Sequence, residues 1–405
     1  MRKTGFLLAS LAASLMATSA LAPSAFAEDI AVKIGVLNDR SGIYADLSGE
    51  GSVVAARLAV EDFGAEAKGI KVEIVAADHQ NKPDVASTIA RQWYDRDGVD
   101  VIADVPTSSA AFAVHDITRE SDKIFLVSTG ASSDLTGKAC SPNTVHWTYD
   151  TWSLAHGTGT AMVQTGGDSW FFLTADYAFG HALEADTSAV VEAAGGKVVG
   201  AVRHPFPGSD FSSFLLQAQA SGAKVIGLAN GGGDTINSIK QAAEFGITQA
   251  GQALAGLLIF ITDVHALGLE TAQGLVLTES FYWNLNDETR AWSERFASAH
   301  NGSMPTMAHA GVYGSVLHYL KAVEAAGTKD TATVMAKMKE LPTDDPLFGK
   351  GEVRADGRKI HDMYLFRVKS PDQSTGPWDY YEVLATVPAA EAFRPMDQGN
   401  CPLVQ

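Results

Sequence analysis

The chain alternates short apolar runs with longer segments in which apolar residues recur every three or four positions. The first run, "VKIGVL" over 32–37, has the length and the β-branched content of a buried strand. The segment near 50–64 that follows has four apolar residues on one helical face: Val53, Ala56, Val60 and Phe63. The pattern therefore predicts a strand followed by an amphipathic helix as its first unit.

This unit repeats along the first third of the chain. Three further strands are predicted before residue 130, at 71–78, 99–105 and 124–129. One helix between them opens after Pro83 and stops at Gly98, and another begins at Ser109. Proline at a helix start and glycine just past its end are typical helix boundaries.

The order of elements restarts near residue 169. Strands are predicted at 169–176, 197–206, 223–230 and 253–261. The helices between them end at Gly195-Gly196, Gly222 and Gly246. Such alternation implies parallel sheets with right-handed crossovers and helices on both faces. We predict an α/β protein of two lobes, each a doubly wound and mostly parallel sheet.

The segment beyond about residue 270 fits neither copy. It is predicted to contain strands at 274–280 and 363–369, and helices near 287–300, 306–326 and 330–340. We interpret it as chain that returns to complete both lobes, so that several crossings between the lobes form a hinge.

The first 27 residues have the features of a secretory signal peptide. Arg2 and Lys3 precede an apolar run, and Ala25-Phe26-Ala27 forms a small-x-small cleavage pattern. Ser and Thr interrupt the run, which is shorter than the ~20 strongly apolar residues of a membrane span. We expect residues 1–27 to be removed and the mature chain to be exported and soluble.

The charge of the chain excludes one class of partner. The formal net charge is −17, and removal of Arg2 and Lys3 leaves −19. Binding to a phosphate backbone needs clustered Lys and Arg, and the sequence has no such cluster. No nucleic-acid partner is expected.

Two cysteines remain in the exported chain, Cys140 and Cys401. A pair in an oxidising compartment indicates one disulfide, which would tie the C-terminal tail to the end of the first αβ region. A catalytic thiol or a metal site are the alternatives. Neither cysteine shows metal-ligand spacing with a histidine.

Small polar residues collect where the predicted strands end. The six loops are "NDRSGIYADLSGEG", "PTSSA", "STGASSDLTG", "ADYAFGH", "NGGGDT" and "TDVHALG". Turns and helix caps use the same residue types. However, ligands of open parallel sheets bind outside the carboxyl ends of the strands. Six such loops on facing edges of two lobes predict a cleft.

The loop Thr107–Ser109, at the start of a predicted helix, allows two chemistries. Its hydroxyls could include a nucleophile, or they could hold an anion with the free N–H groups of the helix start. No base stands beside them in a known pattern. We therefore interpret the loop as a carboxylate cradle, which is compatible with a role as a helix cap.

The same loops carry none of the common enzyme motifs. A nucleophile elbow G-x-S-x-G, a dinucleotide fingerprint, a P-loop and H-E-x-x-H are all missing from the sequence. Ser221 and Lys224 have S-x-x-K spacing, but they fall on the edge away from the cleft. We expect no catalytic residue, no cofactor and no metal ion.

The order of elements resembles the type I periplasmic solute-binding proteins of ABC transporters, in the branch of the leucine/isoleucine/valine-binding proteins. Five segments carry the resemblance: "IGVLNDRSGIYADLSGEGSVVAARLAVEDF", "DVPTSSAAFAVHDI", "FLVSTGASSDLTG", "FFLTADYAFGHALEA" and "FITDVHALGLETAQGLVLTESFYWNLND". The likeness covers essentially the whole mature chain.

The resemblance implies two lobes joined by three crossings, with one solute trapped between them. The lobes would comprise 28–148 plus 280–360 and 149–279 plus 361–388, with 389–405 as a tail. The hydroxyls of Ser108 and Ser109 and the segment Thr129–Ser132, including Ala131, would grip the carboxylate of the solute. The remaining contacts implied by the resemblance are Tyr44 and Tyr177 on its side chain, and Asn230, Gly231 and Asp263 from the second lobe.

Aromatic residues near the crossings leave the class of solute open between amino acids and aromatic acids. Trp283 could give the pocket an aromatic wall that suits an aromatic carboxylate, or it could be a core residue, as Trp147 and Trp152 could. An α-ammonium group needs a desolvated carboxylate opposite it. Asp263 is the candidate, and it could instead cap a helix.

The expected activity is capture of a small carboxylate-bearing solute in the periplasm by hinge closure, by a monomer that then docks on an ABC permease. Two other classes stay open from the sequence. One is an exported enzyme of hydrolase type on the same scaffold, and the other is a ligand-sensing subunit of a receptor.

Overall fold

The structure, a computed structural model, describes Met1 and residues 29–404. Apart from Met1, the expected signal peptide lies outside the described residues. Two parallel sheets form in the described chain, as predicted. The N-terminal sheet has the order β2-β1-β3-β4-β5. Its strands are β1 (Ile30–Asn38), β2 (Ile70–Asp78), β3 (Val101–Asp104), β4 (Ile124–Val127) and β5 (Thr144–His146).

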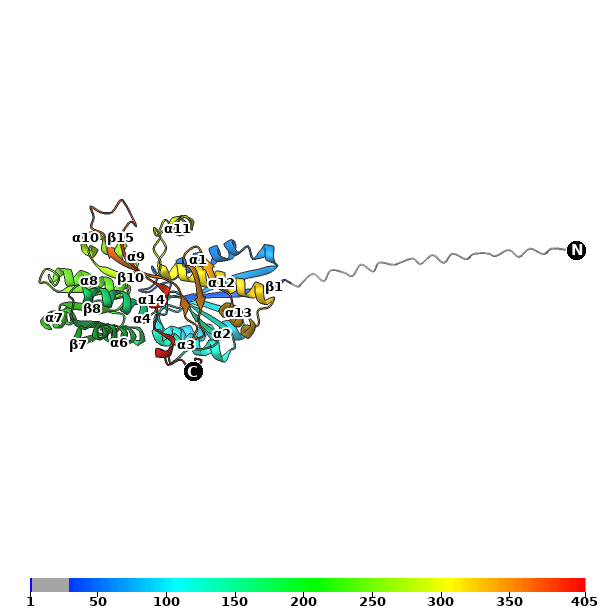
Figure 1. Ribbon diagram of the computed structural model, residues 1–405, viewed down its shortest axis with the longest axis horizontal. Coiled ribbons are helices and arrows are strands. Elements are labelled where there is room, and N and C mark those ends of the chain that lie inside the picture. Colours follow the sequence, from blue (N-terminus) through cyan, green and yellow to red (C-terminus); the bar gives the residue numbers. More distant parts are fainter. Residues whose placement is uncertain (2–28, 405) are drawn as a thin grey trace.

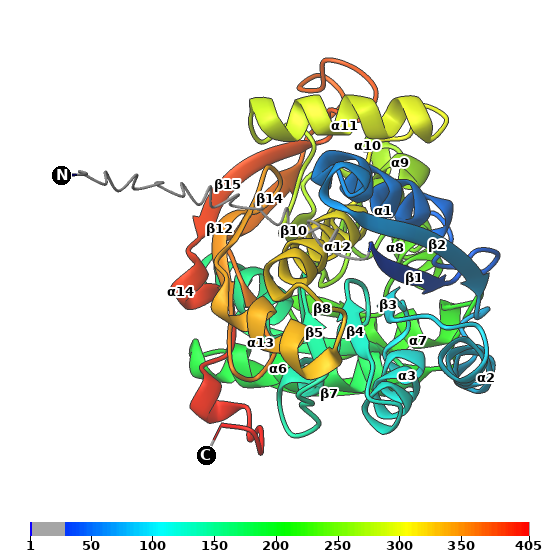
Figure 2. The same cartoon turned by 90° about the vertical axis from the view of Figure 1, so that its right-hand side faces the viewer.

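Helices cover both faces of the N-terminal sheet (Figure 2). They are α1 (Gly49–Phe63), α2 (Pro83–Asp95), α3 (Ser108–Glu120) and α12 (Met307–Ala326). Outside them, α11 (Asp287–Ala299) packs on α1, and α13 (Thr331–Glu340) packs on α12. Val101 and Ala103 of β3 pack in one core with α1 and α12. Ile102, between them, packs in a second core with α2 and α3. Alternate strand residues point to opposite faces, which is why this sheet needs apolar residues at every position.

The C-terminal sheet repeats the arrangement with the order β7-β6-β8-β9. Its strands are β6 (Ser169–Ala175), β7 (Lys197–His204), β8 (Val225–Ala229) and β9 (Ala253–Gly256). The connecting helices are α6 (Ala178–Ala193), α7 (Ser212–Ala220), α8 (Gly233–Glu244), α9 (Ile261–Leu267) and α10 (Leu269–Ala272). β9 is shorter than the predicted strand 253–261, because the chain turns after Gly256 to begin α9.

The chain beyond residue 270 divides its elements as follows. Helices α11, α12 and α13 join the N-terminal sheet, and α1 packs along α12. Strands β10 (Val276–Glu279), β14 (Met363–Val368) and β15 (Tyr381–Val387) form an antiparallel sheet of their own. A second small antiparallel sheet consists of β11 (Thr343–Asp345), β12 (Gly349–Val353) and β13 (Lys359–Ile360). Antiparallel pairing was not predicted; it arises because β14 and β15 are joined directly, without a crossover helix.

Two bodies lie side by side in Figure 1. One contains α6, α7 and α8, and the other contains α1, α2, α3, α12 and α13. Between them runs α4 (Thr151–Leu154), which continues through a π-helical turn at Ala155–Gly159 into α5 (Thr160–Gln164). The two-lobed α/β fold class is confirmed, whereas the residue boundaries of the lobes stay a prediction.

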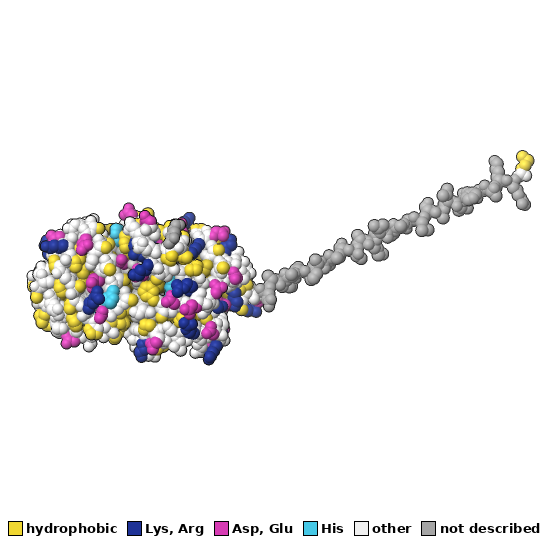
Figure 3. Space-filling view, turned by 90° about the horizontal axis from the view of Figure 1, so that it is seen from below, with side chains coloured by type: hydrophobic (Ala, Val, Ile, Leu, Met, Phe, Trp, Pro, Cys, Tyr) yellow, Lys and Arg dark blue, Asp and Glu magenta, His cyan; other side chains and the backbone are white. Residues whose placement is uncertain are grey.

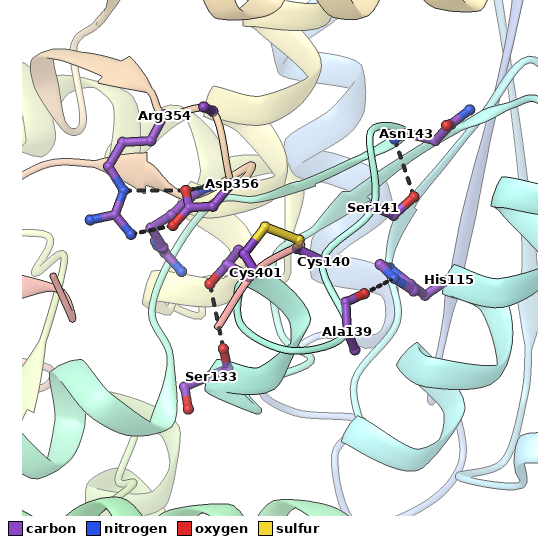
Figure 4. Close-up of a disulfide and its surroundings, with 12 residues drawn as sticks. His115, Ser133, Ala139, Cys140, Ser141, Asn143, Arg354, Asp356 and Cys401 are labelled. Atoms are coloured by element: carbon purple, nitrogen blue, oxygen red, sulfur yellow. Dashed lines mark hydrogen bonds and ion pairs between the residues drawn. A yellow bond between two sulfur atoms is a disulfide. The ribbon is translucent and has the colours of Figure 1, made fainter. Parts of the chain in front are cut away.

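The predicted disulfide is present between Cys140 and Cys401, with the two Cα atoms 5.6 Å apart (Figure 4). It ties the C-terminal tail, with α14 (Ala389–Ala392) and the 3-10 turn Met396–Gln398, to the loop before β5. The tail therefore belongs structurally to the N-terminal body.

Two properties of the described chain bear on its class. None of its helices combines the length and the apolar character needed to cross a membrane. In the same residues, no group of three or more His, Cys, Asp or Glu side chains is arranged to hold a metal ion. On the face in Figure 3, acidic and basic side chains are interspersed.

Candidate functional site

A cavity of about 270 Å³ lies where the carboxyl ends of the two parallel sheets meet. From the N-terminal body it is lined by Tyr44, Leu47, Pro106, Thr107, Ser108, Thr129, Ala131 and Tyr149. From the C-terminal body it is lined by Tyr177, Phe179, Leu258 and Phe260. This volume includes space open to solvent, so the enclosed part is much smaller than the about 300–1,000 Å³ of small-molecule sites. The cavity can therefore hold only a small solute.

The connection from β3 to α3 shapes one end of the cavity. Asp104, Val105 and Thr107 have φ values of 84°, 59° and 77°. A β-branched residue such as Val105 is strained in this region, and such strain concentrates at binding sites. These conformations turn the chain sharply, so that Thr107 and Ser108 at the start of α3 face the cavity.

Ser108 can donate a hydrogen bond into the cavity. Its side chain is almost completely buried, and its Oγ accepts the backbone N–H of Ser132 at 3.1 Å. The hydroxyl proton has no acceptor among the described residues. A buried donor at the start of a 13-residue helix is suited to an anionic oxygen, because the free N–H groups and the helix dipole favour negative charge there.

A buried carboxylate, Asp104, stands behind Thr129. The Thr129 hydroxyl donates to Asp104 Oδ1 at 2.5 Å, and Asn38 Nδ2 donates to Asp104 Oδ2 at 3.1 Å. Burial raises the pKa of Asp104 to about 6, against the opposing effect of hydrogen bonds from Ser52, Thr129 and Asn38. Because Thr129 gives its proton to Asp104, its oxygen can only accept a hydrogen bond from a solute.

Asp104 should make stability depend on pH. Its pKa is higher in the folded chain than the value of 3.8 expected in the unfolded chain, so the folded state holds the proton more tightly. The contribution of Asp104 to the free energy of unfolding should therefore fall as pH rises from about 4 to 6. The fall should be about 3 kcal/mol, at 1.36 kcal/mol per pKa unit.

Urea unfolding at several pH values checks this prediction, with Asp104→Asn as the comparison. The variant lacks the titration, so wild type should lose about 3 kcal/mol relative to it between pH 4 and pH 7. A difference between the two proteins that stays constant across this range would contradict the prediction.

Aromatic rings form the walls of the cavity and meet across the two bodies. The hydroxyls of Tyr44 and Tyr177 are hydrogen bonded at 2.7 Å, and burial raises the pKa of both phenols, which stay neutral. Phe206 stacks on Tyr177 with centroids 4.1 Å apart and on Tyr44 at 5.9 Å. Tyr149 meets Phe260 edge to face. These contacts join the two bodies over the cavity.

Five of the predicted ligand-binding residues line the cavity: Tyr44, Ser108, Thr129, Ala131 and Tyr177. They come from four of the six loops that the sequence singles out. Their contact with a solute stays a prediction.

The remaining predicted hydroxyls lie beside the cavity without lining it. Ser109 is one residue further along α3, and its side chain turns away to a partly exposed position. Ser132 donates its backbone N–H to Ser108, and its Oγ accepts the N–H of Asp134 at 3.4 Å. The structure thus separates Ser108, which faces the cavity, from two neighbours that support the loops around it.

Asn230 and Gly231, at the end of β8, also stand outside the lining. Asn230 is fully buried, and its amide is occupied by His204, Ser238 and Thr235 at 3.2, 3.1 and 2.7 Å. Gly231 lies behind the lining: a Cβ there would be 3.3 Å from Leu258. Both residues shape the second body, whose lining side chains come from the neighbouring loops.

Asp263 and Trp283, the two predicted residues that would distinguish an amino acid from an aromatic acid, are bonded to other groups. Asp263 accepts the N–H of Phe260 at 2.9 Å and so caps α9, the alternative left open by the sequence. Burial raises the pKa of Asp263 to about 7. Trp283 donates its indole N–H to the carbonyl of Trp378 at 2.7 Å. Neither residue is part of the cavity lining.

The sequence did not single out five apolar lining residues: Leu47, Pro106, Phe179, Leu258 and Phe260. Four of them follow a strand end within four positions and Leu47 lies nine residues after β1, but an apolar residue there cannot be told from core by its type. The lining residue Tyr149 was not singled out either, and Trp147, two residues before it, is a fully buried core residue.

A cavity between the strand ends of two parallel-sheet bodies is typical of a two-lobed solute-binding protein. Residues 31–376 match the family model for periplasmic binding protein, and the chain belongs to this family of solute-binding proteins of ABC transporters.

Relatives cover nearly the whole chain. A periplasmic binding protein from Burkholderia mallei is 51% identical, covers 93% of this chain and 100% of its own, and superposes with a TM-score of 0.90. A branched chain amino acid ABC transporter periplasmic ligand-binding protein from Burkholderia xenovorans is 42% identical, covers 92% of this chain and 100% of its own, and has a TM-score of 0.83. A Leu/Ile/Val-binding protein homolog 6 from Brucella melitensis is 28% identical over 90% of this chain and 94% of its own length.

Proposed function

We propose that the protein acts in the periplasm as a monomer that captures a small carboxylate with an apolar, preferably aromatic, body between its two lobes and delivers it to an ABC permease. The observation that carries this proposal is the composition of the cavity. It combines one free hydroxyl donor at a helix start with five aromatic side chains.

The donor end of the cavity supports a carboxylate. Ser108 offers its hydroxyl proton at the start of α3, while the protons of Thr107 and Thr129 are committed to Asn81 and Asp104. The Tyr149 hydroxyl donates to the carbonyl of Thr129, and the Tyr44–Tyr177 hydrogen bond uses one of the two phenol protons. A hydrogen bond to an ionised acceptor contributes about 1.5–3 kcal/mol, roughly twice the value for a neutral pair. The anionic group of a solute is therefore favoured at the end of the cavity formed by the start of α3.

The walls favour an aromatic body over an amino acid. Among the described residues that line the cavity none is acidic, and Asp263, the candidate partner for an α-ammonium, is used as a helix cap. A charged ammonium without a buried partner loses its hydration without compensation. Aromatic rings, in contrast, gain about 0.5–1.5 kcal/mol per well-placed aromatic contact beyond burial.

Contacts between the two bodies support capture by hinge closure. Besides the Tyr44–Tyr177 hydrogen bond, Asp186 on α6 accepts hydrogen bonds from Ser133 at 2.8 Å and from Thr151 at 2.6 Å. A solute that contacts both lobes only in this arrangement shifts the population toward it. Release then requires these contacts to separate.

A thermal-shift screen with isothermal titration of its hits tests the proposal. Benzoate and phenylpropanoid acids should stabilise the protein, by ~2.7 kcal/mol at a hundredfold excess over Kd. The matched controls are the same compounds as amides, which lack the anion, and leucine, isoleucine and valine. Equal binding of acid and amide, or stabilisation by the aliphatic amino acids alone, would contradict it.

A further inference from the structure

Arg358 lies outside the cavity and is fully buried. Its guanidinium donates from Nε to the carbonyl of Lys359 at 2.9 Å, from Nη1 to that of Tyr149 at 3.2 Å, and from Nη2 to that of Trp147 at 2.8 Å. Asp150 stands 3.6 Å from Nη1. Burial lowers the pKa of Arg358 to about 10, against the effect of Asp150, so the group is charged at neutral pH. A buried cation is costly unless its hydrogen bonds are satisfied, so these partners hold it firmly.

The carbonyls that Arg358 holds belong to the segment that carries a cavity wall. Tyr149 lines the cavity, and its hydroxyl donates to the carbonyl of Thr129 at 3.1 Å. The same segment leads directly into Asp150, which caps α4 between the two bodies. The position of the Tyr149 ring is therefore set at its backbone by Arg358 and at its hydroxyl by Thr129.

The opposite face of Arg358 meets the C-terminal tail. Phe393 lies with its ring 4.2 Å from the guanidinium carbon, and the Cys140–Cys401 disulfide anchors the tail eight residues further on. Asp356 accepts the backbone N–H of Arg358 at 3.0 Å and pairs with Arg354 beside the disulfide (Figure 4). One continuous set of contacts thus runs from the disulfide through Arg358 to the cavity.

We propose that Arg358 is a positioning residue for solute binding, which holds the segment Trp147–Tyr149 so that the Tyr149 ring completes the cavity, and that the disulfide-bonded tail holds Arg358 in place through Phe393. The proposal rests on the proposed function. Loosening this set of contacts should weaken solute binding although no group that touches the solute is removed.

Two variants weaken the contacts to different degrees. Arg358→Lys keeps the charge but loses the planar guanidinium, whose two Nη groups reach the carbonyls of Tyr149 and Trp147. Phe393→Leu is milder and removes the ring over the guanidinium. The matched control is Phe63→Leu in α1, a buried ring with the Lys68 ammonium 4.1 Å from its centroid.

In the first measurement, 3-fluorotyrosine replaces Tyr149, and its fluorine resonance is recorded without solute. In the second, Kd for benzoate is measured in the unlabelled variants. Phe393→Leu should shift the resonance and raise Kd by about 3- to 10-fold, and Arg358→Lys should raise it further. Phe63→Leu should lower Tm and leave both readouts unchanged.

The two readouts separate the two proposals. An unmoved resonance and unchanged Kd in both variants, with only Tm lowered, would overturn the positioning role. If wild type binds no carboxylate, the proposed function fails. Even then, a resonance that moves in the Phe393 and Arg358 variants and not in the Phe63 control supports the positioning of Tyr149.

Discussion

Ser108→Ala should weaken binding of the carboxylate solute by about 10- to 100-fold. The hydroxyl of Ser108 is an uncommitted donor at the start of α3, and a hydrogen bond to a charged group contributes about 1.5–3 kcal/mol, with 1.4 kcal/mol per tenfold change in Kd. The substitution leaves the backbone N–H groups of α3 in place, so binding should be weakened and not abolished. Isothermal titration with the best hit of the solute screen measures the change.

Ser109→Ala is the matched control, because Ser109 is the next residue of the same helix and is not part of the cavity lining. Its Kd should stay within about twofold of wild type, since a surface substitution usually changes free energies by no more than ~0.5 kcal/mol. Equal losses in the two variants, or a loss only in Ser109→Ala, would place the anion elsewhere than the structure indicates.

Gly232→Ala should prevent the two lobes from closing fully and raise Kd by tenfold or more. Gly232 caps α8 with φ of 57° and ψ of −131°, a conformation that glycine adopts most easily. A Cβ there would lie 2.8 Å from the carbonyl oxygen of Ile43 and 2.9 Å from the Tyr44 ring, on the opposite lobe. Overpacking of this kind costs about 1–3 kcal/mol, and here opening of the lobes relieves it. The expected signature is a higher Kd with a larger radius of gyration at saturating solute, measured by small-angle scattering.

Gly222→Ala is the control that distinguishes an effect on closure of the lobes from an effect of backbone strain. Gly222 also has a positive φ, 66°, but a Cβ there would meet no atom within 4 Å. Both variants should lose stability because alanine is strained at positive φ. Only Gly232→Ala should lose affinity, and similar Kd values in the two variants would show that this approach of the lobes does not limit binding.

The order of strands and helices could be predicted because both signals are local. Apolar runs such as 32–37 and one-faced helices such as α1 follow from the spacing of residue types, and glycine and proline mark their ends. The antiparallel sheet of β10, β14 and β15 could not, because a strand run carries no mark of its partner. The pairing of Cys140 with Cys401 was predictable only because these are the two cysteines of the chain.

The sequence by itself determined the two-lobed class, the loops that surround the cavity and Ser108 among its residues, since small polar residues at strand ends are readable without coordinates. Tyr44 followed from the family resemblance. Only the tertiary structure decided which neighbours face inward. Ser108 and Ser109 have the same chemistry, yet they lie about 100° apart around α3, so one faces the cavity and the other turns away from it. Asp263 and Trp283 were assigned to the solute by position. Asp263 instead accepts the N–H of Phe260, three residues before it, and Trp283 donates to the carbonyl of Trp378, which long-range packing brings to it. Arg358, with no motif around it, gained its place beside Tyr149 from contacts between segments more than two hundred residues apart.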